Sequence, residues 1–149
     1  MTTAIHLATP QDTDRLLPLV AAFHDEYGLD TTDAGRATAL APLLDGSPLG
    51  AAWLFGPAMA PTGYVIITFG WSMELGGMEA FVDELYIRPN VRKRGIASEV
   101  LAAISGSLKD VGVTALHLEV DRTDAATQRL YTRAHFQLRD RFALMTRVL

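Results

Sequence analysis

Hydrophobic positions along the chain follow two spacings, one helical and one alternating. Helical spacing, bounded by capping residues and glycines, predicts four helices, over 12–28, 32–44, 95–112 and 124–134. Short apolar runs set off by glycine, proline and polar turns predict strands over 4–7, 49–55, 63–69, 81–87, 113–120, 136–138 and 142–148. Pro18 falls inside the first helical pattern, where it either kinks the helix or lies in its first turn.

The order of these elements indicates the fold class. Three strands follow one another without an intervening helix, which does not fit a doubly wound parallel sheet. We therefore expect a mixed α/β (α+β) fold. Its central mixed, mostly antiparallel sheet of about six to seven strands is flanked by about four helices. A chain of 149 residues fits a single domain spanning residues 1–149.

Composition narrows the class of protein. Hydrophobic residues make up 49% and charged residues 20%, as in ordinary globular chains, which excludes wholesale disorder. The absence of cysteine excludes disulfides, thiolate metal sites and a cysteine nucleophile. No apolar run is long enough for a transmembrane helix, so we expect no membrane association. Asp12, Asp14 and Arg15 precede any long apolar run, so we expect no secretory signal and a cytoplasmic location.

Charge is unevenly distributed along the chain. Residues 1–87 hold eleven acids and two bases, a net of −9, whereas residues 88–149 hold eleven bases and six acids, a net of +5. The overall charge of −4 argues against a general nucleic-acid binder. This uneven distribution of charge is consistent with two ligand-binding surfaces of opposite charge or with ordinary solvated faces.

A basic turn between a strand and a helix holds the most specific chemical signal. Three bases stand side by side and are followed by a glycine and small residues: Arg92, Lys93, Arg94, Gly95, Ile96, Ala97 and Ser98. A helix N-terminus offers unpaired N–H groups to an anion, and Gly95 permits close approach. The turn thus fits a phosphate or pyrophosphate. Two alternatives stay open, a solvated basic turn and a nucleic-acid patch.

Two motifs in order resemble the GNAT superfamily of N-acetyltransferases. The segment 92–97 resembles the Arg/Gln-x-x-Gly-x-Gly/Ala signature, and 83–89 looks like the central strand before it. The segment 121–136 is similar to the second motif, Asn-x-x-Ala-x-x-Leu-Tyr-x-x-x-Gly-Phe, and the resemblance covers nearly the whole chain. Two departures are Asp124, where the family often has Asn, and His135, where it has Gly before Phe136.

The resemblance implies acetyl-CoA as cosubstrate, and we expect no metal. Backbone N–H groups of 92–97, with Ser98 at the edge, would bind the coenzyme pyrophosphate, and the backbone of Leu85, Tyr86 and Ile87 would pair with the pantetheine arm. An N–H near Leu85 or Tyr86 could polarise the thioester carbonyl. Asp124 would contact the pantetheine arm or serve only as a helix cap. A homodimer is consistent with the resemblance.

Acetyl transfer to an amine requires a neutral amine, a stabilised oxyanion and a proton for the leaving thiolate. Tyr131 occupies the family's tyrosine position and is the expected acid. Alternation places Val82, Glu84 and Tyr86 on one face of a strand, toward the acceptor, unless a bulge swaps the faces. Glu84 is accordingly the expected base, with Asp83 as the alternative. The histidines show no metal-site spacing and are expected to be structural.

The acceptor is expected to be a small molecule with a cationic primary amine. Acidic residues of the N-terminal half would attract it, and aromatic side chains could contact an alkylammonium; the residues expected to bind it are Glu26, Tyr27, Trp71 and Glu84. The amine would attack directly in a ternary complex. Two alternatives stay open, a protein lysine or N-terminal acetyltransferase and a non-catalytic acyl-CoA-binding regulatory module.

Overall fold

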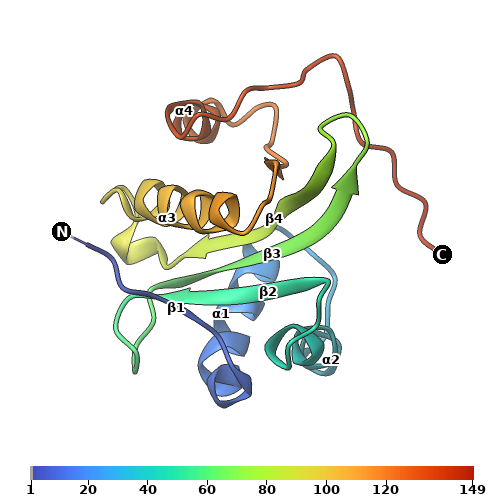
Figure 1. Ribbon diagram of the computed structural model, residues 1–149. Helices are drawn as coiled ribbons and strands as arrows, with labels where there is room; N and C mark the ends of the chain where they lie inside the picture. The colour runs from blue at the N-terminus through green and yellow to red at the C-terminus, as the bar shows by residue number, and fades with distance from the viewer. Residues whose placement is uncertain (1) are drawn as a thin grey trace. The chain divides into compact units, whose positions relative to one another are not determined.

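The computed structural model describes residues 2–149, which fall into two compact units, one ending at Glu119 and one spanning Val120–Leu149 (Figure 1). The first unit contains, in order, β1 (Ile5–Leu7), a 3₁₀ turn (Pro10–Asp12), α1 (Thr13–Glu26), α2 (Asp33–Leu44), β2 (Gly50–Phe55), β3 (Gly63–Ser72), β4 (Gly77–Ile87), a 3₁₀ turn (Pro89–Val91), α3 (Ile96–Asp110) and β5 (Ala115–Leu118). The second unit contains α4 (Ala125–Arg133).

The sheet of the first unit follows the chain order β1-β2-β3-β4-β5. The first three pairings are antiparallel, and β4 and β5 are parallel. Helices α1 and α2 cover one face and α3 covers the other (Figure 1). The expected mixed, mostly antiparallel sheet with about four helices is therefore confirmed, with five strands in place of six to seven.

Apolar faces of α1 and α2 pack on the sheet to form the main core. Leu16 and Leu19 of α1 are fully buried against Leu54 of β2 and Tyr64 of β3. Each such side chain contributes about 1.5–3 kcal/mol when it leaves water. On α3, the buried positions recur at helical spacing: Val100, Leu101, Ile104 and Leu108.

Local sequence signals explain where the helices begin. The Thr32 hydroxyl accepts a hydrogen bond from the Gly35 N–H at 3.0 Å and caps α2. Gly95 precedes α3 with φ of 81°, a conformation that side chains disfavour. Asp124 caps α4 by accepting from the Thr127 N–H at 3.0 Å. Pro18 lies within α1 beyond its first turn.

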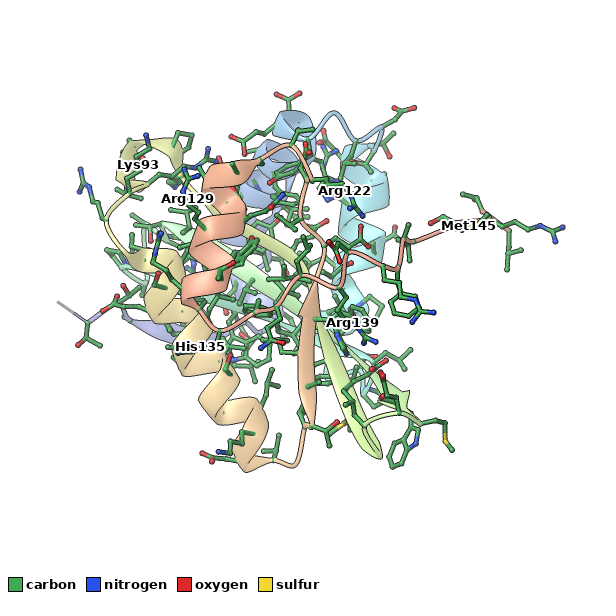
Figure 2. All side chains as sticks on the ribbon, turned by 90° about the horizontal axis from the view of Figure 1, so that it is seen from above. Lys93, Arg122, Arg129, His135, Arg139 and Met145 are labelled. Carbon is green, nitrogen blue, oxygen red and sulfur yellow. The ribbon has the colours of Figure 1, made fainter. Side chains whose placement is uncertain are left out.

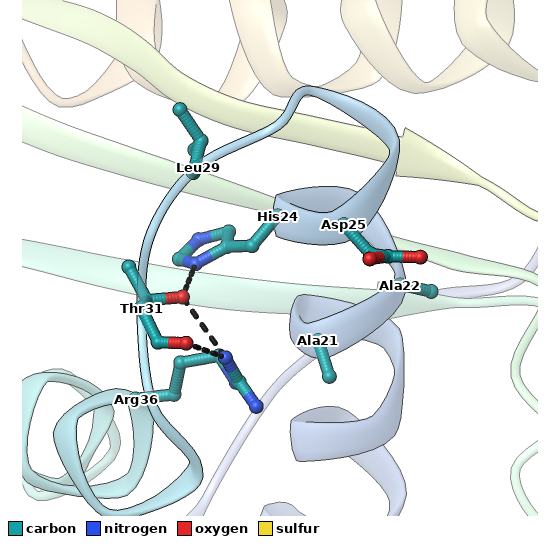
Figure 3. Close-up of a pocket in the computed structure, with 7 residues that line it drawn as sticks. All are labelled: Ala21, Ala22, His24, Asp25, Leu29, Thr31 and Arg36. Atoms are coloured by element: carbon teal, nitrogen blue, oxygen red, sulfur yellow. Dashed lines mark hydrogen bonds between the residues drawn. The ribbon is translucent and has the colours of Figure 1, made fainter.

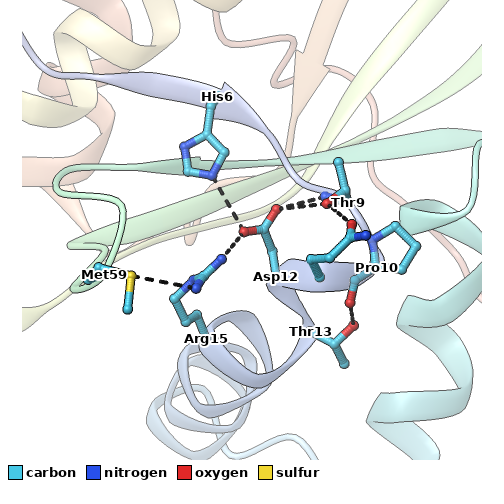
Figure 4. A network of polar contacts seen from close by, with 8 residues as sticks. His6, Thr9, Pro10, Asp12, Thr13, Arg15 and Met59 are labelled. Carbon is cyan, nitrogen blue, oxygen red and sulfur yellow. Dashed lines mark hydrogen bonds and ion pairs between the residues drawn. The ribbon is translucent and has the colours of Figure 1, made fainter.

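A polar network ties the start of α1 to β1 (Figure 4). The carboxylate of Asp12, which is 6% exposed, accepts from the Thr9 N–H at 2.8 Å and pairs with Arg15. His6 Nε2 lies 3.8 Å from the same carboxylate. Burial opposes the ionisation of Asp12, but the hydrogen bonds from Thr9 and Arg15 outweigh it and lower the pKa of the carboxyl.

A β-bulge interrupts β4 where alternation was expected to continue. Ile66 pairs with Glu84 and the next residue, Ile67, pairs with Val82, so Asp83 is the extra residue. Ile66 belongs to the core under α1 and α2, and neighbouring residues of a strand point to opposite faces. Glu84 therefore faces α1, whereas Val82 faces the other side. Val82 and Glu84 therefore do not share a face, because the bulge that was named as the exception to strict alternation is present.

Other boundaries also differ from expectation. Strands β3 and β4 extend into a tight turn at 73–76, so Trp71 lies inside β3. The expected strands over 136–138 and 142–148 are absent from the part of the chain that the structure describes. Phe142 and Val148 are 61% and 91% exposed, and Met145 lies on the extended C-terminal segment (Figure 2). A short apolar run forms a strand only beside a hydrogen-bonding partner, and residues 136–148 form no strand pairing in the described chain.

Among residues 2–149, none of the helices has the length and apolar character needed to cross a membrane.

Candidate active site

The turn before α3 has the backbone geometry of an anion site. Lys93 and Gly95 have positive φ values of 63° and 81°. The first backbone hydrogen bond of the helix runs from the Glu99 N–H to the Gly95 carbonyl at 3.1 Å, which leaves the N–H groups of residues 96–98 outside the helical ladder. Lys93 projects outward from this turn (Figure 2). The positive end of the helix dipole adds to the attraction for an anion.

Arg92 points away from this N-terminus and toward α1. Its Nε donates to the Ile87 carbonyl at 2.8 Å, and its Nη2 donates to both carboxylate oxygens of Glu26 at 2.8 and 3.0 Å. The guanidinium also lies over the Tyr86 ring, 5.5 Å from its centroid. Arg92, expected to contact coenzyme, and Glu26, expected to contact the acceptor, are thus paired with each other.

The second half of β4 has an open backbone edge. Pairing with β5 ends at Val82 and Leu118, while pairing with β3 continues to Ile87. The Arg88 N–H bonds to the Thr62 carbonyl on the β3 side at 2.8 Å. Because backbone groups alternate along a strand, the N–H groups of Leu85 and Ile87 face the open edge. Of the two expected donors to a thioester carbonyl, the geometry therefore favours Leu85 over Tyr86.

Glu84 is held through both of its carboxylate oxygens. Oε2 lies 2.6 Å from His24 Nε2 in α1, and Oε1 accepts from the Tyr64 hydroxyl of β3 at 2.7 Å. The side chains of His24 and Glu84 are only 12% and 13% exposed. Burial of Tyr64, and then the adjacent Glu84 charge, raise the pKa of the phenol, so Tyr64 remains a donor.

His24 connects this carboxylate to a hollow beside the C-terminal end of α1 (Figure 3). His24 Nδ1 lies 2.7 Å from the Thr31 hydroxyl, and Arg36 Nη1 donates to that hydroxyl at 2.9 Å. The hollow has a volume of about 440 Å³, within the range of small-molecule sites. Its lining residues are Ala21, Ala22, His24, Asp25, Leu29, Thr31 and Arg36.

The other expected acceptor residues do not gather around this hollow. Tyr27 is 62% exposed and stacks on Phe23, with ring centroids 4.6 Å apart. Tyr86 is buried in the core. Trp71 pairs with Met78 near the other end of β3, five residues past Ile66, which corresponds to roughly 17 Å along a strand. Asp83 is exposed at the bulge.

Tyr131 and Asp124 belong to the second unit. The Tyr131 ring meets Phe136 edge-on, with centroids 5.9 Å apart. Both oxygens of Asp124 are engaged by Thr127, whose hydroxyl is the main cause of the lowered pKa of this carboxyl. Asp124 is thus a helix cap, one of its two expected roles. His135 stands where the motif that the sequence resembles has glycine, and its φ of 72° is a conformation that favours glycine.

Sequence reasoning missed His24 and Tyr64, the two partners of Glu84. His24 lies 60 positions before Glu84 and Tyr64 lies 20 positions before it. No local spacing indicates such contacts, because helix packing and strand register create them. Among residues 2–149, no group of three or more His, Asp or Glu side chains could hold a metal ion.

The comparisons with known proteins agree with this architecture. The acetyltransferase (GNAT) family model matches residues 20–136, and no curated protein matches. An integron cassette protein from the mobile metagenome of Cole Harbour Salt Marsh is 30% identical, with TM-score 0.85 over 97% of this chain and 90% of that one.

Two more distant structures share the fold. A predicted acetyltransferase from Clostridium acetobutylicum, solved with acetyl-CoA, is 16% identical, with TM-score 0.78 over 97% of this chain and 96% of that one. An aminoglycoside acetyltransferase from an uncultured soil metagenomic sample, solved with sisomicin, is 12% identical, with TM-score 0.82 over 99% and 96%. The family match spans most of the chain, so this protein belongs to the GNAT family and is an acetyltransferase.

Proposed function

We propose that the protein transfers an acetyl group from acetyl-CoA to the primary amine of a small cationic acceptor, by direct attack in a ternary complex. The observation that carries this proposal is the open edge of β4, which continues through a short turn to the N-terminus of α3. These features fit the two parts of the coenzyme differently. An extended amide-containing arm suits a strand edge, and a pyrophosphate suits free N–H groups at a helix start.

In this proposal each residue has a defined task. N–H groups of residues 96–98 hold the pyrophosphate, with charge from Lys93 and Arg94. The Leu85 N–H donates to the carbonyl oxygen on which negative charge develops during attack. A carboxylate on β4, Glu84 or the exposed Asp83, assists removal of the amine proton. Tyr131, in the second unit, is the proposed proton donor to the leaving thiolate.

The acceptor class is proposed from the charge around α1 and α2. Asp25 lines the hollow, and Asp30 is exposed in the adjoining segment. Two other acids there already have basic partners, since Glu26 pairs with Arg92 and Asp33 with Arg36. A volume of about 440 Å³ suits a small amine. The aminoglycoside enzyme with the same fold is consistent with this class. A homodimer and a cytoplasmic location stay predictions.

Thermal unfolding with acetyl-CoA tests the first half of the proposal. Coenzyme at ~100 times its Kd stabilises the folded state by about 2.7 kcal/mol, which raises Tm by roughly 5–11 °C at this size. ATP, NAD and short duplex DNA are tested separately as comparison ligands. Arg94→Gln should weaken coenzyme binding, whereas Lys109→Gln, the same charge loss at the other end of α3, should leave it unchanged. A Tm rise of this size with duplex DNA and none with acetyl-CoA would refute the coenzyme site.

Release of free thiol from acetyl-CoA tests the second half of the proposal, which is acetyl transfer to a small amine. The acceptors to be compared are a polyamine, an amino sugar, an aminoglycoside and a lysine-containing peptide. We expect turnover with at least one small amine and slower turnover with the peptide. Faster turnover of the peptide would favour a protein acetyltransferase. Coenzyme binding without turnover of any amine would favour the non-catalytic acyl-CoA-binding module.

A further inference from the structure

Four side chains form a chain of hydrogen bonds that ends at Glu84, and its donors can be ordered. Arg36 has only donors, so the Thr31 hydroxyl accepts from it at 2.9 Å. The hydroxyl proton is then available to His24 Nδ1, which lies 2.7 Å away. With Nδ1 accepting, a neutral imidazole carries its proton on Nε2 and donates it to Glu84 at 2.6 Å.

Glu84 itself is poorly placed to meet an acceptor amine. Its two oxygens are already engaged by His24 and Tyr64, and its side chain is 13% exposed. The exposed member of the hydrogen-bond chain is Thr31, which lines the hollow together with His24 and Asp25 (Figure 3). A proton that leaves an amine in this hollow therefore meets the Thr31 hydroxyl before it can reach the carboxylate.

We propose that His24 is the proton acceptor of the acetyl transfer, reached through the Thr31 hydroxyl, and that Glu84 is a positioning residue that holds the imidazole. This assignment rests on the proposed function and changes the role expected for Glu84. It also gives His24 a role in the reaction, where the sequence suggested only a structural one.

The proton transfer balances without any further reactant. The ammonium N–H bond of the acceptor breaks and its proton bonds to Thr31 Oγ1, while the original hydroxyl proton moves to His24 Nδ1. The products are a neutral amine, whose lone pair can attack the thioester carbonyl, and an imidazolium. The imidazolium donates to Thr31 and to Glu84, and the carboxylate stabilises its charge. After transfer, the proton returns to solvent through Thr31.

The tautomer of His24 can be measured without any substrate. Two-bond ¹H–¹⁵N spectra of the full chain, labelled at histidine, distinguish a protonated Nε2 from a protonated Nδ1. The signals of His24 are identified by their loss in His24→Gln. We expect the Nε2–H form at a pH where the ring is neutral. A neutral ring protonated on Nδ1 would overturn the proposal.

Turnover of Thr31→Val provides the second test, with Thr38→Val, the same change at an exposed position of α2, as control. We expect kcat to fall about 100-fold or more, KM for acetyl-CoA to change less than twofold, and Thr31→Ser to restore most of the activity. The Tm rise with acetyl-CoA should persist in Thr31→Val. Turnover equal to that of the wild type would overturn the relay.

The two proposals fail in different ways. A wild-type protein that turns over none of the amines refutes the proposed function, and the tautomer measurement still decides the arrangement around His24. An active wild type with an equally active Thr31→Val refutes the relay alone. If Thr31→Val unfolds early, the tautomer measurement on the wild type decides, because a neutral His24 ring protonated on Nδ1 cannot accept the proton from Thr31.

Discussion

Asp12 keeps its charge although its side chain is almost fully buried. Hydrogen bonds from the Thr9 N–H and from Arg15 stabilise the carboxylate and lower its pKa against the opposing effect of burial. A carboxyl whose folded-state pKa is depressed stabilises the fold above its unfolded value of about 3.9. The stabilisation is lost as the pH falls through the folded pKa.

Asp12→Asn should therefore destabilise the protein by about 1–3 kcal/mol at pH 7, since Arg15 loses its charged partner. The difference between wild type and variant should shrink as the pH falls below about 4. Urea unfolding at a series of pH values measures this difference. Asp30→Asn, at an exposed position, is the control and should change stability little. A difference that stays constant down to pH 2 would contradict the assignment.

Contacts between side chains from distant elements could not be predicted from the sequence. The three bases before α3 were expected to act together on an anion, but Arg92 is turned to Glu26 of α1, 66 positions earlier. Charge and turn chemistry are local properties, whereas the direction of a long side chain depends on what the fold brings near it. Gly95 was expected only to permit close approach of an anion, and its φ of 81° adds a conformation that favours glycine.

Two glycines show how the surrounding element decides the effect of one methyl group. A Cβ added at Gly63 in β3 would lie 2.1 Å from the Tyr86 carbonyl oxygen and 2.4 Å from Phe55. A Cβ added at Gly106 in α3 would meet nothing within 4 Å. We expect Gly63→Ala to destabilise the fold by about 3 kcal/mol or more.

Gly106→Ala is expected to stabilise the fold by roughly 0.5–1 kcal/mol, because alanine favours the helix. Thermal unfolding of both variants measures the two effects in opposite directions. A tolerated Gly63→Ala would mean that β3 and β4 separate more easily than their register suggests.

At the level of elements, helices and long strands were predictable and the bulge was not. Helical periodicity and capping residues placed α1, α2, α3 and α4 to within a few residues. Strict alternation over 81–88 failed at Asp83, because a bulge depends on the pairing between two strands rather than on one. That bulge turns Glu84 toward His24. The contact between His24 and Glu84 therefore depends on the bulge, which the pattern of a single strand does not predict.

The chain divides into two compact units at residue 120, and the two predicted strands that are absent from the described residues both lie in the second unit. The apolar run over 142–148 indicated a strand, but a strand needs a partner, and Val120–Leu149 form a separate unit whose regular element is α4. Tyr131 belongs to this unit, so its role as the acid rests on the motif alone. This role therefore stays a prediction.

The substitution Tyr131→Phe tests the proposed role of Tyr131 as the acid. Loss of a general acid should lower kcat by about 10²–10⁴-fold, while the Tm rise with acetyl-CoA should remain, because the proposed coenzyme contacts of the first unit are unchanged. Thr38→Val, which removes an exposed hydroxyl from α2, is the control. If Tyr131→Phe turns over as fast as the wild type, the thiolate receives its proton elsewhere, and the second unit contributes no acid to the reaction. If both kcat and the Tm rise are lost, Tyr131 acts in coenzyme binding instead.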